Sequence, residues 1–155
     1  MGDGVESELI FLMGQFEARF PTDRLYATNH LWASESQGRY RFGFSAYAVR
    51  LLQDVYFLEW SVDAGAVLRE RQEIGNIESK KAESALFAPI AGTLVRFNTG
   101  LLRDPSAINV DKYGTGWLFE MSGDGGKLLE AAGYLRHLES VWEITQRTIK
   151  GQLNE

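Results

Sequence analysis

The most informative segment of the sequence is Ile77-Glu78-Ser79-Lys80-Lys81-Ala82-Glu83-Ser84-Ala85-Leu86-Phe87-Ala88-Pro89-Ile90-Ala91-Gly92. Two apolar runs flank a short polar turn, a pattern that predicts a β-hairpin with a lysine at its tip. A lysine that projects from a tight turn is exposed to solvent and accessible to other molecules. A turn rich in Glu and Lys is also common as a plain solvated loop, so the interpretation depends on the rest of the chain.

Composition narrows the class of protein. The chain has 155 residues, 45% of them apolar, and a formal net charge of -5. This length suits one compact domain, and the negative charge disfavours nucleic acid and anionic lipid as partners. Because the sequence has no cysteine, disulfides and thiolate catalysis are excluded, and any redox-active sulfur must come from a cofactor. Two histidines are too few for a histidine-built metal site.

The N-terminal sequence bears on location. It is acidic, with Asp3, Glu6 and Glu8, whereas a secretory signal begins with basic residues. No apolar run approaches the length of a membrane span. We therefore expect a cytoplasmic protein that binds neither nucleic acid nor membrane.

Hydrophobic periodicity divides the chain into three parts. Leu9, Leu12, Met13 and Phe16 recur at helical spacing and predict an N-terminal helix that ends at Pro21. The sequence then predicts an N-terminal helical extension over residues 1–25, a β domain over 26–122, and a C-terminal helical segment over 123–155 packed on that domain. Leucines recur at helical spacing beyond the glycine-rich residues 123–126.

Within the β domain, alternating or β-branched segments predict individual strands. These segments are residues 39–42, 55–60, 93–97 and 116–121, together with the two arms of the lysine hairpin. Ser45 is positioned to cap a short helix over residues 46–52. Short strands joined by glycine turns, with helices at the ends, predict a small β-sandwich or flattened barrel.

The lysine hairpin and several other segments resemble the H protein family of the glycine cleavage system, and they occur in the same order as in that family. In chain order they are His30-Leu31-Trp32, Gly43-Phe44-Ser45-Ala46-Tyr47-Ala48, Leu52-Gln53-Asp54-Val55-Tyr56-Phe57-Leu58-Glu59, Glu78-Ser79-Lys80-Lys81-Ala82 with Ala88-Pro89 and Gly92, Asn109, and Tyr113-Gly114-Thr115-Gly116-Trp117-Leu118. The resemblance spans residues 26–134 and implies an H-protein-like fold of the lipoyl/biotinyl type. A biotin carrier is expected to have methionines on both sides of its lysine, and this chain has none there.

The resemblance implies a carrier that is not itself an enzyme. Lipoate would be attached covalently to Lys81, and Lys80 stands where the family has Val. Glu78 and Gly65 match positions that the lipoate-attaching enzyme is thought to read. The loaded chain would shuttle an aminomethyl group between a pyridoxal-phosphate glycine decarboxylase, an aminomethyltransferase and dihydrolipoyl dehydrogenase. No catalytic residue and no metal ligand is expected.

Two positions depart from the resembled pattern. The family holds its aminomethyl group in a cleft with acidic residues, and two of those positions are Leu31 and Ala85 here. An ammonium group that loses water needs a charge partner, so these changes leave the cargo open. A lipoate carrier for sulfur transfer, sulfur oxidation or lipoyl relay is one alternative, and an interaction module without lipoate is another. His30 is expected to be a hydrogen-bonded structural residue.

Overall fold

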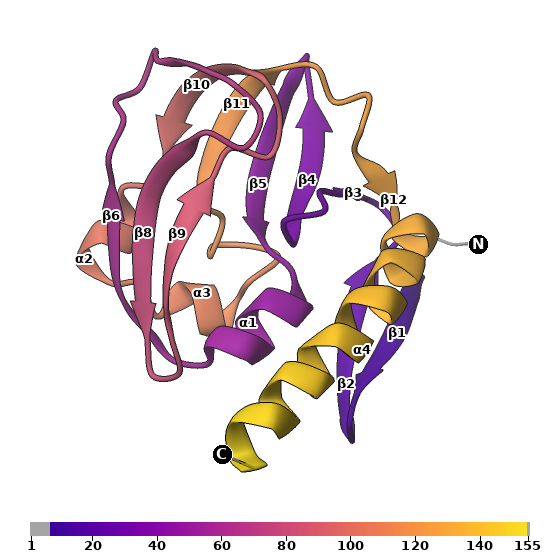
Figure 1. Ribbon diagram of the computed structural model, residues 1–155. Coiled ribbons are helices and arrows are strands. Elements are labelled where there is room, and N and C mark those ends of the chain that lie inside the picture. Colours follow the sequence, from indigo (N-terminus) through magenta and orange to yellow (C-terminus); the bar gives the residue numbers. More distant parts are fainter. Residues whose placement is uncertain (1–6, 155) are drawn as a thin grey trace.

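The computed structural model describes residues 7–154, with side chains described through residue 144. Its main body consists of two antiparallel sheets (Figure 1). The larger sheet has the strand order β12 (Leu129–Glu130), β3 (Leu25–Tyr26), β4 (Leu31–Ser36), β5 (Arg39–Phe44), β11 (Phe119–Gly123), β10 (Gly92–Phe97) and β7 (Val67–Leu68). The smaller sheet has the order β6 (Val55–Trp60), β8 (Glu73–Ser79) and β9 (Glu83–Phe87).

The described part of the chain also forms four helices. They are α1 (Ala46–Leu52), α2 (Gly100–Arg103), α3 (Ala107–Val110) and α4 (Ala131–Asn154). Figure 1 shows α1 at the same end of the molecule as the turn between β8 and β9, while α4 runs alongside the N-terminal strands. The strands expected over residues 39–42, 55–60 and 93–97 and the helix expected over 46–52 are confirmed.

The principal core lies between the two sheets. Phe42 of β5 and Phe119 of β11 occupy paired positions, and their ring centroids are 5.3 Å apart. Ile74 and Ile77 of β8 are fully buried against them in the same cluster. Because side chains of a strand alternate between its two faces, one face of each sheet is apolar and closes on the other. The prediction of a mostly β sandwich is confirmed.

A second apolar cluster joins the two ends of the chain to the larger sheet. Tyr134 of α4 stacks on Tyr26 with ring centroids 4.8 Å apart, and Phe20 meets Tyr134 edge-on at 5.3 Å. Leu138, one turn further along α4, is fully buried in the same cluster. The expectation that the C-terminal helix packs on the β domain therefore agrees with these contacts.

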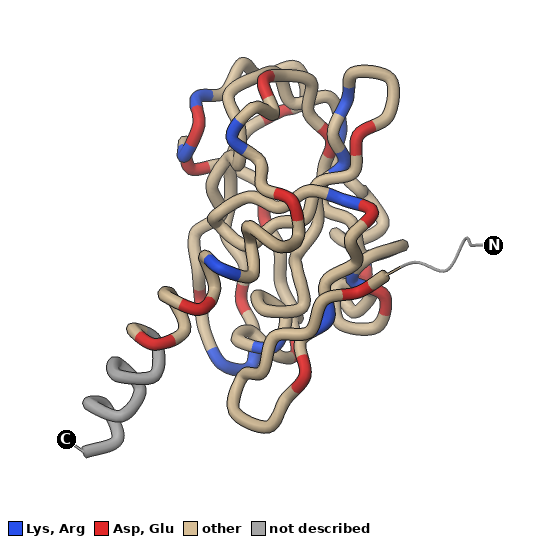
Figure 2. The backbone as a smooth tube through the Cα atoms, turned by 90° about the vertical axis from the view of Figure 1, so that its right-hand side faces the viewer, with Lys and Arg blue, Asp and Glu red and all other residues tan. Residues whose placement is uncertain are grey.

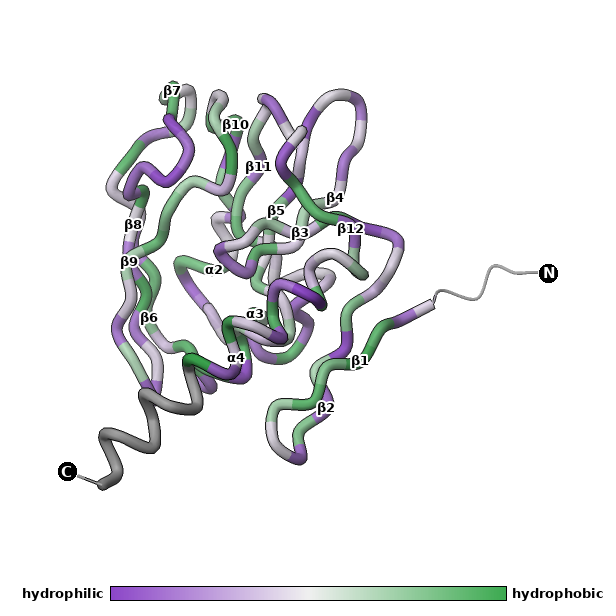
Figure 3. The backbone as a smooth tube through the Cα atoms, turned by 45° about the vertical axis from the view of Figure 1, so that its right-hand side comes forward, coloured by the Kyte–Doolittle hydropathy of each residue, from purple (hydrophilic) through white to green (hydrophobic). Residues whose placement is uncertain are grey.

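The predicted N-terminal helix is wrong, because residues 8–21 form a β-hairpin. Strands β1 (Glu8–Met13) and β2 (Phe16–Pro21) pair in antiparallel register. Gly14 adopts a φ of +65° between them, which suits the first central position of a two-residue hairpin turn. Apolar residues at alternate positions then face α4 and α1, and Figure 3 shows apolar stretches in both strands.

Two element boundaries also differ from the sequence prediction. Leu129 belongs to the short strand β12, so the C-terminal helix begins only at Ala131. The last long strand begins at Phe119 rather than Gly116. Gly116 is held instead in a tight loop, where its backbone N–H donates to the Asp111 carbonyl at 2.9 Å. Such local hydrogen bonds between neighbouring loop residues are invisible to hydrophobic periodicity.

Charged residues of both signs are interspersed over the described chain (Figure 2). The best-formed cluster lies on the larger sheet, where Glu120 accepts hydrogen bonds from Arg41 at 2.9 Å and Arg96 at 2.6 Å. These bonds lower the pKa of the Glu120 carboxyl, with the bond from Arg96 the larger cause. No helix in residues 7–154 is long and apolar enough to cross a membrane.

If the β1–β2 hairpin is an integral part of the core, replacing a side chain by Ala should matter on its buried face and not on its exposed face. We expect Phe20→Ala to lower the free energy of unfolding by about 3 kcal/mol, because Phe20 is fully buried against Tyr26 and Tyr134. Leu12→Ala on the exposed face should change it by less than about 0.5 kcal/mol. Urea unfolding of both variants measures the difference, and equal effects would show that the hairpin is not packed as described.

Candidate functional site

The turn between β8 and β9 is short and well supported by hydrogen bonds. Ser79 donates its backbone N–H to the Ala82 carbonyl at 2.8 Å, leaving Lys80 and Lys81 as the central residues. The Ser79 side chain is buried, and its hydroxyl oxygen accepts the backbone N–H of Lys81 at 3.3 Å and of Ala82 at 3.1 Å. Both lysines are exposed. The predicted hairpin with a lysine tip is confirmed.

A β-bulge in β8 sets which side chains reach the core before this turn. The pairing with β9 shifts between Glu73 and Gly75, so one extra residue lies on β8. A Cβ on Gly75 would lie only 2.4 Å from the Glu59 carbonyl oxygen, so the close approach of β6 requires glycine here. Beyond the bulge, Ile77 and Ser79 are buried while Glu78 is half-buried.

The turn is also tied to the loop that follows α1. The backbone N–H of Lys80 donates to the Asp54 carbonyl at 2.8 Å. Asn109 holds this loop from both sides, since its side-chain amide donates to the Gln53 carbonyl at 2.6 Å and accepts the Val55 N–H at 3.0 Å. Gln53 has a φ of +59°, which is unusual for a residue other than glycine. The Asn109 amide thus compensates for a strained loop that supports the lysine turn.

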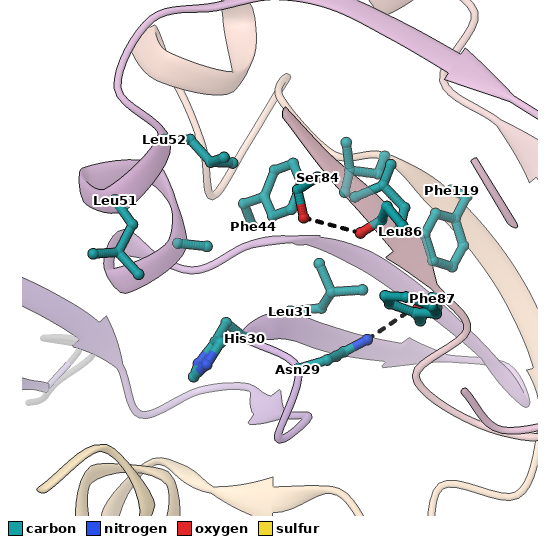
Figure 4. Close-up of a pocket in the computed structure, with 13 residues that line it drawn as sticks. Asn29, His30, Leu31, Phe44, Leu51, Leu52, Ser84, Leu86, Phe87 and Phe119 are labelled. Atoms are coloured by element: carbon teal, nitrogen blue, oxygen red, sulfur yellow. Dashed lines mark hydrogen bonds between the residues drawn. The ribbon is translucent and has the colours of Figure 1, made fainter. Parts of the chain in front are cut away.

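An apolar cleft lies beside the hairpin, between α1 and β9 (Figure 4). Its volume is about 180 Å³. Leu51 and Leu52 of α1 form one side, and Leu86 and Phe87 of β9 form another. Leu31, which is buried, contributes to its floor. The cleft and the exposed lysines are therefore adjacent along the chain, since β9, which forms part of the cleft, begins just after the turn.

His30 is the titratable residue of the cleft. Its Nδ1 lies 2.9 Å from the Tyr134 hydroxyl, which is in turn 2.8 Å from the Ser45 hydroxyl. Burial, with a smaller contribution from the nearby His137, lowers the pKa of His30 to about 4. The imidazole is therefore neutral at pH 7 and bridges the cleft to α4. This geometry agrees with the expected structural role of His30.

Of the three residues that the family resemblance assigns to lipoate attachment, the structure places Glu78 near Lys81 and Gly65 away from both. Glu78 lies three residues before Lys81, near the end of β8, the strand that leads into the turn. Gly65 lies beyond the opposite end of the smaller sheet, because β6 begins at Val55 beside the turn and ends at Trp60. There Gly65 adopts a φ of +93° and donates its N–H to the Leu94 carbonyl at 2.7 Å. It is therefore not close to Lys81.

The two departures from the family pattern both lie in the cleft. Leu31 and Ala85 contribute to its lining, from β4 and β9 respectively. Asp, Glu, Lys and Arg are absent from the residues that line it. An exposed lysine beside an apolar cleft fits a long, largely apolar arm such as lipoate, because the turn leaves the amine accessible and the cleft offers apolar surface. Within the described residues, no cluster of His, Cys, Asp and Glu could hold a metal ion.

The fold and this hairpin define a small β-sandwich domain of the carrier type. Comparison with known proteins specifies the family. The family model for the glycine cleavage H-protein matches residues 24–146. The glycine cleavage system H protein of Beutenbergia cavernae is 38% identical over 115 residues, covering 74% of this chain and 92% of the relative. That of Pseudoalteromonas atlantica is 39% identical over 127 residues, covering 79% and 98% respectively.

A solved structure agrees with these sequence relatives. The crystal structure of a glycine cleavage system H protein from Mycobacterium marinum matches with a TM-score of 0.67 and 34% identity, covering 74% of this chain and 95% of that chain. The chain belongs to the glycine cleavage H-protein family, whose members carry lipoate, and it is a carrier component and not an enzyme. The β1–β2 hairpin precedes the part that the family model matches.

Sequence reasoning missed the residues that support the turn from outside it. Asp54 acts through its backbone carbonyl, which carries no sequence signal. Asn109 stands 28 positions after Lys81 in the chain and is recognisable only as an isolated match to the family pattern. A polar residue in an otherwise apolar helical turn, as in Ala107-Ile108-Asn109-Val110, is the weak signal that was available.

Removal of the Ser79 hydroxyl should loosen the turn. We expect Ser79→Ala to lower the free energy of unfolding by about 1 kcal/mol, because two backbone N–H groups lose their acceptor. Amide hydrogen exchange at Lys81 and Ala82 should accelerate at the same time. Ser84→Ala is the control, since the exposed Ser84 hydroxyl only donates to its neighbour's carbonyl. A Ser79 variant with unchanged exchange rates would contradict the assigned role of the hydroxyl.

The neutral state of His30 predicts that stability falls in mild acid. The pKa is about 4 in the folded protein and 6.5 in the unfolded chain. Below pH 6.5 the unfolded chain therefore binds a proton that the folded protein does not, and stability decreases as the pH falls toward 4. Between pH 7 and pH 5 the protonation of His30 in the unfolded chain should lower the free energy of unfolding by about 2 kcal/mol. It is measured by urea unfolding at both values.

The matched variant for this measurement is His30→Asn. Asn tolerates the positive φ of +73° found at this position better than most residues, and it does not titrate. The decrease between pH 7 and pH 5 should be smaller in this variant by about 2 kcal/mol. An identical decrease in both proteins would assign the pH dependence to groups other than His30.

Proposed function

We propose that Lys81 carries lipoate in amide linkage and that the chain serves as the lipoyl carrier of the glycine cleavage system. The observation that carries this proposal is the turn itself, where two exposed lysines follow Glu78-Ser79 at the tip of a rigid hairpin. The register of the motif selects Lys81 rather than Lys80. When bound, lipoate supplies a disulfide that can be reduced and can carry a small group between active sites.

The contribution of this chain is to present the arm. A rigid turn on a folded domain keeps the end of a long flexible arm within a small volume. The arm's effective concentration at a docked active site is then high, without any need for tight binding of the cargo. The backbone N–H groups of Lys80 and Lys81 donate hydrogen bonds to the Asp54 carbonyl and the Ser79 hydroxyl, so the backbone at the lysine is held and the arm is the mobile part.

The partners that we propose follow from this role. They are a pyridoxal-phosphate glycine decarboxylase, an aminomethyltransferase, dihydrolipoyl dehydrogenase and a lipoate-attaching enzyme. The last would read Glu78 and Gly65. Since these residues lie toward opposite ends of the smaller sheet, an enzyme that reads both must contact the length of that sheet. Gly65 would then act through the conformation of its loop, whereas Glu78 would act through its side chain. Cytoplasmic location is part of the same proposal.

The apolar cleft favours a second candidate function. Because Leu31 and Ala85 remove acidic groups from the cleft lining, a carrier with a neutral or sulfur-based cargo is the alternative within the same fold. The two functions differ in whether the lipoylated chain accepts an aminomethyl group from glycine decarboxylase. Acceptance at the rate of an ordinary H protein would remove the support for the alternative.

The attachment site is tested with adjacent lysines. Lys81→Arg should abolish modification by a lipoate-attaching enzyme, because the protonated guanidinium group is not a nucleophile that can accept an acyl group. Lys80→Arg should leave modification unchanged, since it alters the neighbouring residue with the same charge. Intact mass and peptide fragmentation measure the adduct, and circular dichroism confirms that both variants fold. Modification that persists in Lys81→Arg and disappears in Lys80→Arg would move the site by one residue.

A further inference from the structure

We propose that the outer face of the larger sheet, at the end that carries the β4–β5 turn, binds an acidic segment of a partner protein through Arg39, Arg41 and Arg96. The bound segment is extended and presents carboxylates at alternate positions. This inference goes beyond the proposed function, because the site lies away from the lysine turn and does not require lipoate.

The cationic side chains lie on the face of the larger sheet that points away from the core. Arg41 of β5 pairs with Glu120 of β11, which pairs in turn with Arg96 of β10. The neighbours of the first two along their strands, Phe42 and Phe119, are fully buried between the sheets. Because side chains alternate along a strand, Arg41 and Glu120 point outward, and Arg96 is exposed beside them.

This face contains a hollow of about 410 Å³ with a positive charge. Three arginines and one glutamate line it and give it a net charge of +2, although the chain as a whole carries -5. The rest of its lining consists of Ser34, Ser36 and Gln37. All three are exposed, so the hollow is open to a ligand. A local positive region on an acidic chain attracts anions and steers their approach.

Two of the arginines are held in place and still keep donors for a ligand. Arg41 donates from Nε to Glu120 at 2.9 Å, and Arg96 donates from Nε at 2.6 Å and from Nη2 at 3.3 Å. Both guanidinium groups lie over the Trp117 ring, 4.2 and 5.3 Å from its centroid. Since a guanidinium group has five N–H donors, these bonds leave some of them available. Side chains that are already ordered lose little entropy when a ligand binds.

Arg39 supplies an uncompensated charge. It is exposed, and its side chain has no ion pair or hydrogen bond with the side chains that the structure describes. It is the first residue of β5 and pairs with Ser36 across the turn, so its backbone is fixed by the sheet. A carboxylate that binds Arg39 displaces no existing partner and can accept two parallel hydrogen bonds from the guanidinium group.

The spacing of the arginines suits an extended polypeptide. Arg39 and Arg41 are two positions apart on the same strand, which is about 7 Å. Side chains at alternate positions of an extended peptide have the same spacing and point to the same side. A segment with the pattern Glu-x-Glu that runs along β5 therefore brings one carboxylate to each arginine.

The hollow also continues as a groove along the strands. A second hollow, of about 380 Å³, shares Ser34 and Arg41 with the first and reaches Trp32 and Tyr113. The four residues of β4 from Ser36 back to Trp32 span about 13 Å, which accommodates about four residues of an extended segment. A free phosphate would occupy only one end of this groove. Nucleic acid carries charge along its whole length and would meet the acidic remainder of the chain.

The arginine hollow and the lysine turn lie at opposite ends of the sandwich. Strand β5 begins at Arg39 and ends at Phe44 beside α1, and α1 lies at the same end as the β8–β9 turn (Figure 1). A partner bound through the arginines therefore leaves the lysine turn uncovered. Exposed ion pairs give weak binding with fast association, which suits a partner that must exchange.

The test titrates the full chain with three peptides and follows the backbone amide NMR signals of Arg39 and Arg41. Acetyl-Thr-Glu-Thr-Glu-Thr-amide has the proposed spacing. Acetyl-Thr-Thr-Glu-Glu-Thr-amide has the same composition with adjacent carboxylates, and acetyl-Thr-Gln-Thr-Gln-Thr-amide is neutral. At about 20 mM NaCl we expect the alternating peptide to bind about tenfold more tightly than the neutral one and about threefold more tightly than the adjacent one. The difference should disappear at about 0.5 M NaCl.

Two variants locate the site. Arg39→Gln removes one ion pair and should weaken binding of the alternating peptide about threefold. Arg103→Gln removes the same charge from an exposed residue of α2 outside the hollow, and it should leave the affinity unchanged. Both side chains are exposed, and circular dichroism confirms that both variants fold.

Each contrary outcome overturns the inference in a different way. Equal affinity for the alternating and neutral peptides, or for the alternating and adjacent peptides, removes the acidic segment with alternate carboxylates as the ligand. Equal weakening by Arg39→Gln and Arg103→Gln reduces the effect to the net charge of the chain. Inorganic phosphate that binds as tightly as the alternating peptide makes the hollow a phosphate site. Self-association that Arg39→Gln abolishes assigns the face to a second copy of the chain.

The inference and the proposed function can fail separately. All of these measurements use the chain without lipoate, so a negative result leaves the assignment of Lys81 untouched. Absence of a lipoyl adduct on Lys81, in turn, does not alter the affinity of the arginine hollow for the peptides.

Discussion

The pairing of β8 with its two neighbours is the constraint on which the rest of the site depends. Side chains of a strand alternate, so a shift of one residue would turn the core face toward solvent. In β8 the bulge beside Gly75 shifts the pairing with β9 by one residue, which allows Ile74 and Ile77 to be buried together. Ser79 then points inward and organises the turn, and the lysines occupy its tip.

The cleft depends on the same strand arrangement but also on the ends of the chain. One wall is β9, which follows the turn, and another is α1, which is packed against the larger sheet. His30 joins this region to α4 through Tyr134. The N-terminal hairpin packs against Tyr134 through the ring of Phe20. The β1–β2 hairpin, which lies outside the matched family region, therefore contacts a residue that supports the cleft.

The chemistry of its lining residues, more than its shape, decides what the cleft can bind. A hollow of this size could hold a cation if acidic residues lined it, but the substitution of Leu and Ala at residues 31 and 85 leaves apolar and neutral groups. The residues that line the described cleft include no carboxylate, so an ammonium group placed there would lack a charged partner.

The sequence by itself determined the sandwich, the lysine hairpin and the departures at Leu31 and Ala85. These features follow from strand alternation, turn chemistry and motif order, which are local along the chain. Only the tertiary structure decided that residues 8–21 form a hairpin, because their apolar spacing fits a helix and a strand pair alike and Gly14 adopts its positive φ within that pairing. It also decided that Asn109 braces the turn and that Leu31, Ala85 and α1 share one cleft. Contacts between residues distant in the chain depend on how the sheets close, and neither periodicity nor propensity specifies that.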